Sequence, residues 1–438
     1  MTRLSPFPYV AERANVDGNM TTPTGPFDRL VIATLIVVSM FTDPFARVAT
    51  VALTGDRVLG LAALVALPIL LARRRHAWTA IHTALGIFVV VQILTSLANV
   101  GTWPSGLRFV SIYPMGFACF ALTVQCAGAP DVRRFAIRLL VVTGAIVGLI
   151  AALAAGLANL WGSRLRGSRE MVIMPDARPI FVGRVMFREQ NFLGSFLLLP
   201  FTLELWAPRS ISVTLMRART SVWQLVAIVF GIVFSFTRAA WLAAAAIIGL
   251  WWCSVRPRGR TLFAIVAIAI IATAVLVMTM GTAPLVVRST KIVTGVDRTL
   301  GTRVLVDRAV LRSSLEHPLI GQGAGSVNRL WVLGLRKRTV EQPWTGNMEL
   351  HVLHDSGFPG LAALVGVGLA VVRAVRRRRA AARDEEWRSV VKPLVIAGLG
   401  IFFAFQFTHG LWLMFPYVFL GLLTAALDTS GKDARAGA

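Results

Sequence analysis

Two histidines and an aspartate lie close together in the last third of the chain and have the residue types of a general base. His351 and His354 are three positions apart, and Asp355 follows His351 by four. In a helix these spacings place the three side chains on one face. A carboxylate beside an imidazole orients the ring and raises its basicity, which suits proton abstraction. Mutual hydrogen bonding inside a helix bundle explains the same spacing without catalysis, and the set is too small to predict a metal site.

A second group of polar residues at expected helix ends has the chemistry of an anion site. Arg238 stands between two apolar runs with no acid nearby. A charge at membrane depth costs about 2.5–3.5 kcal/mol on insertion scales, so such a residue either serves function or extends to the interface. Guanidinium groups bind phosphate oxygens in bidentate fashion. We expect the same role for the other members of this group, although Arg303 also fits a solvated helix face. They are Arg184, Arg188, Asn191, Arg303, Arg308 and Asn347.

The composition places these residues in a membrane protein. The 438 residues have a mean hydropathy of +0.69, and 56% are hydrophobic while 15% are charged. Apolar runs of about 20 residues predict helices that cross a bilayer. We expect an all-α integral membrane fold with about 12 transmembrane helices in residues 29–428. The segments 1–28 and 429–438 are expected to be cytoplasmic tails.

The charges outside the apolar runs indicate an anionic ligand. Basic clusters follow alternate runs, as expected on a cytoplasmic side beside anionic lipid, and account for much of the formal net charge of +24. We see no nucleic-acid-binding module. On the opposite side, bases outnumber acids by six to three in segment 162–190 and by ten to four in segment 281–347. The larger segment contains an amphipathic helix at 302–316, followed by a glycine-rich turn without the context of a dinucleotide site. We predict no cofactor and no metal, but a lipid-linked phosphate or pyrophosphate at the outer face.

Four of these segments occur in an order that resembles a known family. They are an arginine-rich run before a span (184–191), a Ser-x-x-Arg-x-x-Trp-Leu element (235–242), an arginine-headed helix running into His-Pro-Leu-Ile-Gly-Gln-Gly (303–323), and a segment from Asn347 to Gly360. In this order, with a large outer loop between the third and the fourth, the chain resembles the O-antigen ligase and O-antigen polymerase superfamily of bacterial polytopic membrane glycosyltransferases.

The resemblance implies a metal-independent, inverting transfer in the bacterial cytoplasmic membrane, with the active site facing outward. The implied donor is a glycan on a polyprenyl pyrophosphate, and the acceptor is another glycan or a glycolipid. By position, Arg238 and Arg303 would hold the pyrophosphate. Family ligases commonly place a catalytic histidine directly before the asparagine that corresponds to Asn347, whereas this chain has Gly346 there. His351, one helical turn onward, is the nearest substitute.

Two other functions fit the same residues. One is a transporter or flippase of a lipid-linked glycan, although transporters usually place polar groups near the midplane on broken helices. The other is a non-catalytic assembly partner of the cell envelope, which the absent junctional histidine favours.

Overall fold

The computed structural model describes residues 26–43, 46–48, 51–73, 78–166, 168–171, 180–206, 218–255, 298–329, 346–381 and 386–428. Nearly all of both predicted tails, the predicted span near 261–280 and much of the segment 281–347 lie outside these residues.

The described chain is mostly helical, as expected. Its α-helices are α1 (Pro26–Val38), α2 (Gly55–Arg73), α3 (Ala80–Ala98), α4 (Gly106–Val110), α5 (Ile112–Ala127), α6 (Pro130–Trp161), α7 (Gln190–Trp206), α9 (Ala218–Phe234), α10 (Arg238–Val255), α13 (Arg298–Glu316), α14 (Met348–Ala381), α15 (Lys392–Ala404) and α16 (Phe415–Leu427). A 3-10 turn, η1 (Ser326–Arg329), precedes α14, and a π-helical turn, η2 (Trp387–Val391), leads into α15.

Several of these helices have the length and composition of membrane spans. Among the described residues, five stretches are long and apolar enough to cross a bilayer: Ala80–Ala98, Gly106–Ala127, Pro130–Trp161, Met348–Ala380 and Trp387–Ala404. The apolar runs of the sequence predict spans at about 78–98 and 107–127, which agree with two of these stretches. They also predict a first span from about Leu30 to Phe45, whereas α1 ends at Val38. The count of about 12 spans stays a prediction.

The expectation of an all-α chain is wrong at two places, where antiparallel hairpins form. Strand β1 (Ala46–Val48) pairs with β2 (Val51–Leu53), and β3 (Ser168–Met171) pairs with β4 (Ile180–Gly183). Strands of three and four residues are too short for an alternating pattern to show in the sequence.

The second hairpin is fixed to the end of α6. Strand β4 is buried along its whole length. The side chain of Asn159 takes the place of a neighbouring strand, since its Nδ2 donates to Phe181 O at 2.6 Å and its Oδ1 accepts the Phe181 N–H at 2.8 Å. Helix α6 has 32 residues and is therefore about 48 Å long, more than the roughly 30 Å of hydrocarbon in a bilayer. Its excess length gives the hairpin a rigid support.

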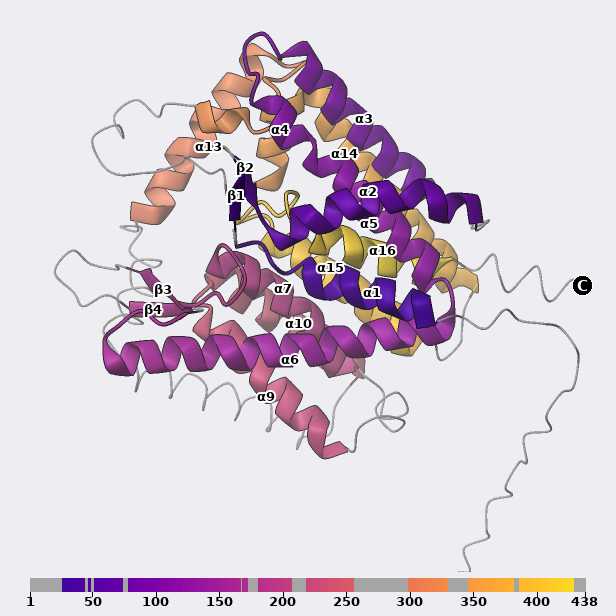
Figure 1. Ribbon diagram of the computed structural model, residues 1–438, viewed down its shortest axis with the longest axis vertical. Coiled ribbons are helices and arrows are strands. Elements are labelled where there is room, and N and C mark those ends of the chain that lie inside the picture. The colour runs from indigo at the N-terminus through magenta and orange to yellow at the C-terminus, as the bar shows by residue number, and fades with distance from the viewer. Residues whose placement is uncertain are drawn as a thin grey trace, which may run out of the picture.

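The helices pack as a bundle around one large apolar core (Figure 1). The most extensive contacts join α6 to α9, α3 to α14 and α5 to α16. In Figure 1 both hairpins and α13 lie towards the left of the bundle. The segments predicted to lie outside the membrane thus gather at one end of the molecule.

A buried ionic network joins several helices. It lies near basic residues that the sequence predicts on the cytoplasmic side of the membrane. Arg133, at the start of α6, pairs with Glu386, just before η2, and donates to the carbonyls of Ala127 and Ala425. Arg378, near the end of α14, lies 3.2 Å from the same glutamate. Both guanidinium groups are buried. One carboxylate thus fixes the ends of α6 and α14 to each other.

Candidate functional site

The helix that carries the predicted histidines is interrupted just after them. Gly357 has φ 66° and ψ −166°, and Pro359 follows. The N–H of Phe358 donates outside the helix instead of to the carbonyl of His354, and Pro359 has no N–H to offer the carbonyl of Asp355. The break therefore leaves two carbonyl groups without helical partners beside the predicted base.

The segment 317–325, which we call the glycine strap, supplies the missing donors. The N–H groups of residues 322–323 donate to the carbonyls of His354 and Asp355, both at 2.9 Å. This close approach requires glycine, because a Cβ on Gly321 would lie 2.5 Å from a backbone nitrogen of α14. Three glycines of the strap have left-handed φ values, at 65°, 87° and 71° for Gly321, Gly323 and Gly325. The segment predicted as a flexible turn is thus attached to the first part of α14.

Helix α3 holds the glycine strap from the other side. The Ser96 hydroxyl oxygen accepts the Ala324 N–H at 3.0 Å, and the Trp103 indole donates to the carbonyl of the same alanine at 2.9 Å. The Asn99 amide donates to Gly321 O at 3.4 Å. The strap is therefore fixed between two helices, and this fixes the position of the residues that follow it.

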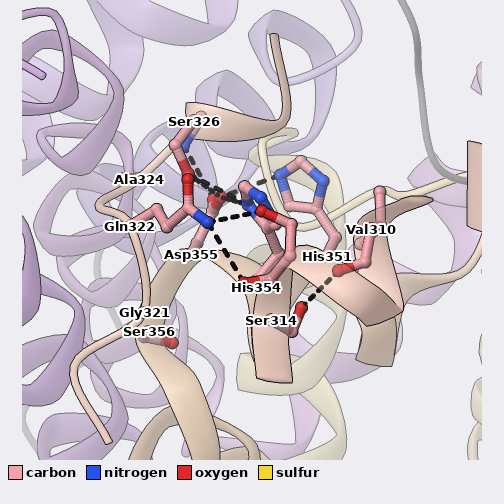
Figure 2. A network of polar contacts seen from close by, with 12 residues as sticks. Val310, Ser314, Gly321, Gln322, Ala324, Ser326, His351, His354, Asp355 and Ser356 are labelled. Carbon is pink, nitrogen blue, oxygen red and sulfur yellow. Dashed lines mark hydrogen bonds and ion pairs between the residues drawn. The ribbon is translucent and has the colours of Figure 1, made fainter. Parts of the chain in front are cut away.

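Asp355 is the centre of the polar network shown in Figure 2. Its side chain is fully buried. Oδ2 accepts the Gly325 N–H at 2.7 Å and lies 3.2 Å from His351 Nε2. Oδ1 accepts the Ser326 hydroxyl at 3.2 Å and lies 3.6 Å from His354 Nδ1, while Ser326 Oγ is 3.0 Å from the same nitrogen. The structure thus brings the three predicted catalytic residues together and adds a serine from η1.

The ring of His351 is enclosed by the segment between α15 and α16. It stacks on the His409 ring, with centroids 4.6 Å apart and 14° between the planes. The Trp412 ring meets His351 edge-on at 5.1 Å. His351 is consequently only 2% exposed. We refer to five residues as the histidine cluster: His351, His354, Asp355, Ser326 and His409.

Two of the predicted arginine segments meet where α7 and α10 begin. The Thr237 hydroxyl donates to Gln190 O at 3.2 Å and lies 3.4 Å from Asn191 Oδ1. Phe236, at φ 53°, turns the chain before the half-buried Arg238 starts α10. Helix N-termini carry partial positive charge, so two of them beside an arginine form an environment that favours an anion.

Arg184 and Arg188 lie in the loop that leads into α7. The guanidinium group of Arg184 forms an ion pair with Asp43 at 3.1 Å and donates to Arg188 O at 3.2 Å. The N–H of Arg188 donates to the Thr42 hydroxyl at 2.8 Å, and its side chain is exposed. The chain before β1 therefore fixes the backbone of this loop and leaves one guanidinium group accessible.

The segment 405–414 relates the histidine cluster to these arginines. Its Trp412 contacts His351, as described above, and the adjoining Phe415 meets the Phe187 ring at 6.4 Å, edge to face. Phe187 precedes Arg188 directly. An apolar contact path therefore joins the two groups of candidates.

Of the remaining predicted residues, Asn347 lies one helical turn before His351, whose N–H donates to the Asn347 carbonyl at 3.2 Å. Asn347 caps α14, since its Oδ1 accepts the Leu350 N–H at 2.9 Å, and its amide contacts Gln406 at 3.3 Å. Arg308 is exposed on α13, and in the described ranges it makes no hydrogen bond or ion pair with another predicted site residue. The side chain of Arg303 lies outside what the structure describes.

Comparison with protein families shows which family this part of the chain resembles. Residues 223–365 match the family model described as O-antigen ligase. These residues are similar to the O-antigen ligase family. The match begins in α9 and ends in α14, so it includes Arg238, the glycine strap and four members of the histidine cluster: Ser326, His351, His354 and Asp355. The match supports the family predicted from the sequence, and with it a membrane protein of polysaccharide biosynthesis. A comparison with curated proteins finds no match.

The match to the O-antigen ligase family supports a membrane glycan ligase or polymerase activity. Among the described residues, no group of three His, Cys, Asp or Glu side chains has an arrangement that would hold a metal ion. The groups present can orient an imidazole, bind an anion and exclude water.

Sequence reasoning missed two contributors to the cluster. Ser326 is 28 positions from the histidine it contacts, and Trp412 is 61 positions from His351, so no local spacing connects either pair. The sequence offers one indication for the serine. It directly follows Gly325, at the end of a glycine-rich segment whose backbone needs fixed hydrogen-bond partners. His409 was visible only as a polar residue at the end of an apolar run.

Proposed function

We propose that the protein transfers a glycan from a polyprenyl-pyrophosphate donor to a glycan or glycolipid acceptor. The transfer takes place at the outer face of the bacterial cytoplasmic membrane, without a metal, and inverts the anomeric centre. The observation that carries this proposal is His351 held against the fully buried Asp355 within the residues that match the O-antigen ligase family.

His351 is the base in this proposal. The carboxylate 3.2 Å from Nε2 favours the tautomer with a proton on that nitrogen, so the lone pair is on Nδ1. The acceptor hydroxyl gives its proton to Nδ1 while its oxygen attacks the anomeric carbon. Asp355 stabilises the imidazolium that forms and touches no substrate, because its two oxygens are already engaged. His354 and Ser326 hold the carboxylate in place.

The arginines bind the leaving group. As the bond from the anomeric carbon to the pyrophosphate oxygen breaks, the lipid pyrophosphate departs with the electron pair, and guanidinium groups stabilise its charge. The family resemblance assigns this role to Arg238 and Arg303. The meeting of two helix N-termini beside Arg238 supports it, and Arg184, Arg188 and Asn191 line the approach. Arg308 and Asn347 remain candidates for contacts to the glycan.

Reconstitution tests the proposal directly. Purified protein in proteoliposomes, given a radiolabelled lipid-linked oligosaccharide and an acceptor glycolipid, is expected to move label to the acceptor. His351→Ala should lower the rate by about 10²–10⁴-fold, the usual contribution of a general base. His76→Ala is the matched control, because the sequence places His76 near the inner face, away from the cluster. It should transfer at the wild-type rate.

The same vesicles separate the alternatives. Movement of intact donor across the bilayer without transfer would identify a flippase. If the folded protein neither transfers nor moves a donor that a known ligase accepts, the result would favour a non-catalytic assembly partner. Equal rates for both histidine variants would place the base elsewhere.

A further inference from the structure

A pocket of about 640 Å³ lies beside the second hairpin, outside the residues that match the O-antigen ligase family. We call it the hairpin pocket. Three arginines line it together with one acid and several apolar side chains. Its lining residues are Phe41, Asp43, Ile150, Arg164, Leu165, Arg166, Ser168, Arg184, Val185 and Met186.

The charges of the hairpin pocket are not balanced. Asp43 is the one acid among the described residues that line the pocket, and it is paired with Arg184 at 3.1 Å. Arg164 and Arg166 are exposed, and no described residue forms an ion pair with either. Two guanidinium groups therefore face the pocket without a carboxylate from the described chain. This pattern suits a phosphate or diphosphate group, which two guanidinium groups can bind in bidentate fashion.

The pocket also adjoins an apolar surface. Ile150 belongs to a stripe on α6 whose members are spaced by three or four positions and are all exposed. The stripe consists of Ile146, Ile150, Leu153, Leu157 and Leu160, and the exposed Trp161 directly follows it. Because α6 is a candidate membrane span, an exposed apolar stripe on it faces lipid. A ligand with its charged head in the pocket can thus keep its hydrocarbon in the bilayer along α6.

We infer that the hairpin pocket binds the phosphate-bearing head of an amphiphile that arrives laterally from the membrane along α6. The hairpin pocket is distinct from the histidine cluster. Its role in transfer rests on the proposed function, which it extends. The shared chemistry fits two sources, the lipid pyrophosphate of the donor and a phosphorylated glycolipid acceptor. The loop from Arg184 to Asn191 connects the pocket to the start of α10, so either lipid would be held next to the proposed leaving-group site.

Binding without turnover tests this inference. The full-length protein in phosphatidylcholine nanodiscs is titrated with farnesyl diphosphate, phosphatidic acid, tailless inorganic pyrophosphate, and farnesol, which has no phosphate. We expect at least one phosphate lipid to bind about tenfold or more tightly than both pyrophosphate and farnesol. The tighter of the two phosphate lipids identifies the pocket as a donor or an acceptor site.

Two double variants of equal charge make the test specific. Arg164→Gln with Arg166→Gln should weaken that binding about tenfold or more. Arg134→Gln with Arg376→Gln removes two exposed arginines remote from the pocket and should leave binding unchanged. Equal losses in both variants, or farnesol binding as tightly as the phosphate lipids, would overturn the inference. His351→Ala should bind normally, so a failure of the catalytic proposal and a failure of the pocket are distinguishable.

Discussion

At the scale of single residues, the state of Asp355 decides what the histidine cluster can do. The carboxylate is buried and held by one backbone N–H, one hydroxyl and two imidazole rings. A buried anion is stable only with such a complete set of partners. Its position, more than its own reactivity, is what it contributes to the chemistry of His351.

Asp355→Asn tests this role. The amide lacks the charge that stabilises an imidazolium. Its NH₂ group is a donor and would face another donor, either the Gly325 N–H or the Ser326 hydroxyl. We expect transfer to fall by about 10²–10⁴-fold, as when a general base loses its effect. Ser314→Ala is the control, since that buried hydroxyl bonds only within α13, to Val310 O at 2.7 Å. A variant that transfers normally would show that His351 needs no oriented partner.

At the other end of the molecule, two buried arginines depend on one carboxylate. Removing the carboxylate in Glu386→Gln leaves Arg133 and Arg378 buried without their anion, a change that typically costs about 3–5 kcal/mol. The exposed pair between Arg29 and Asp131, with side chains 51% and 44% exposed, provides the comparison.

Thermal unfolding in one detergent measures both changes. Asp131→Asn should cost less than about 1 kcal/mol, as surface ion pairs usually do. A similar small loss for Glu386→Gln would mean that water reaches the network.

At the scale of elements, the glycine strap and the break in α14 depend on each other. Gly321→Ala places a methyl group 2.5 Å from a backbone nitrogen of α14, at φ 65°, so the strap must move away from Asp355. We expect loss of transfer together with lower thermal stability. Gly366→Ala on the same helix is the control, because its Cβ would meet nothing within 4 Å. It should be neutral or stabilising by about 0.5–1 kcal/mol. Full activity of Gly321→Ala would show that the strap does not position the cluster.

Elements with strong periodicity could be predicted from the sequence, and those fixed by distant contacts could not. The apolar run of α6 predicts an end near Trp161, where Gly162 follows at φ 65°, but the helix begins at Pro130, earlier than the span predicted to follow Arg138. The β3–β4 hairpin depends on Asn159 of α6, and the strap depends on Ser96 of α3 and on Trp103 between α3 and α4. The meeting of His351, His354 and Asp355 followed from helical spacing. Their enclosure by the segment 405–414 did not, since only the tertiary fold sets it.

At the scale of the whole molecule, orientation in the membrane is the property on which function depends. The histidine cluster belongs to the proposed outer end, and the network around Glu386 belongs to the proposed cytoplasmic end. Cysteine labelling in spheroplasts tests this, in a background with Cys253→Ser because that thiol is exposed. A membrane-impermeant maleimide should label Arg312→Cys on α13 but not Arg376→Cys near the end of α14. Labelling with the opposite preference would reverse the topology.

The most direct test of the central claim is a density map of the protein with a bound non-hydrolysable lipid pyrophosphate. The account predicts phosphate oxygens within about 2.7–3.2 Å of the Arg238 guanidinium group, with the first sugar position directed towards His351. Pyrophosphate bound at the cytoplasmic end, or held on the outer side with its sugar position directed away from His351, would contradict it.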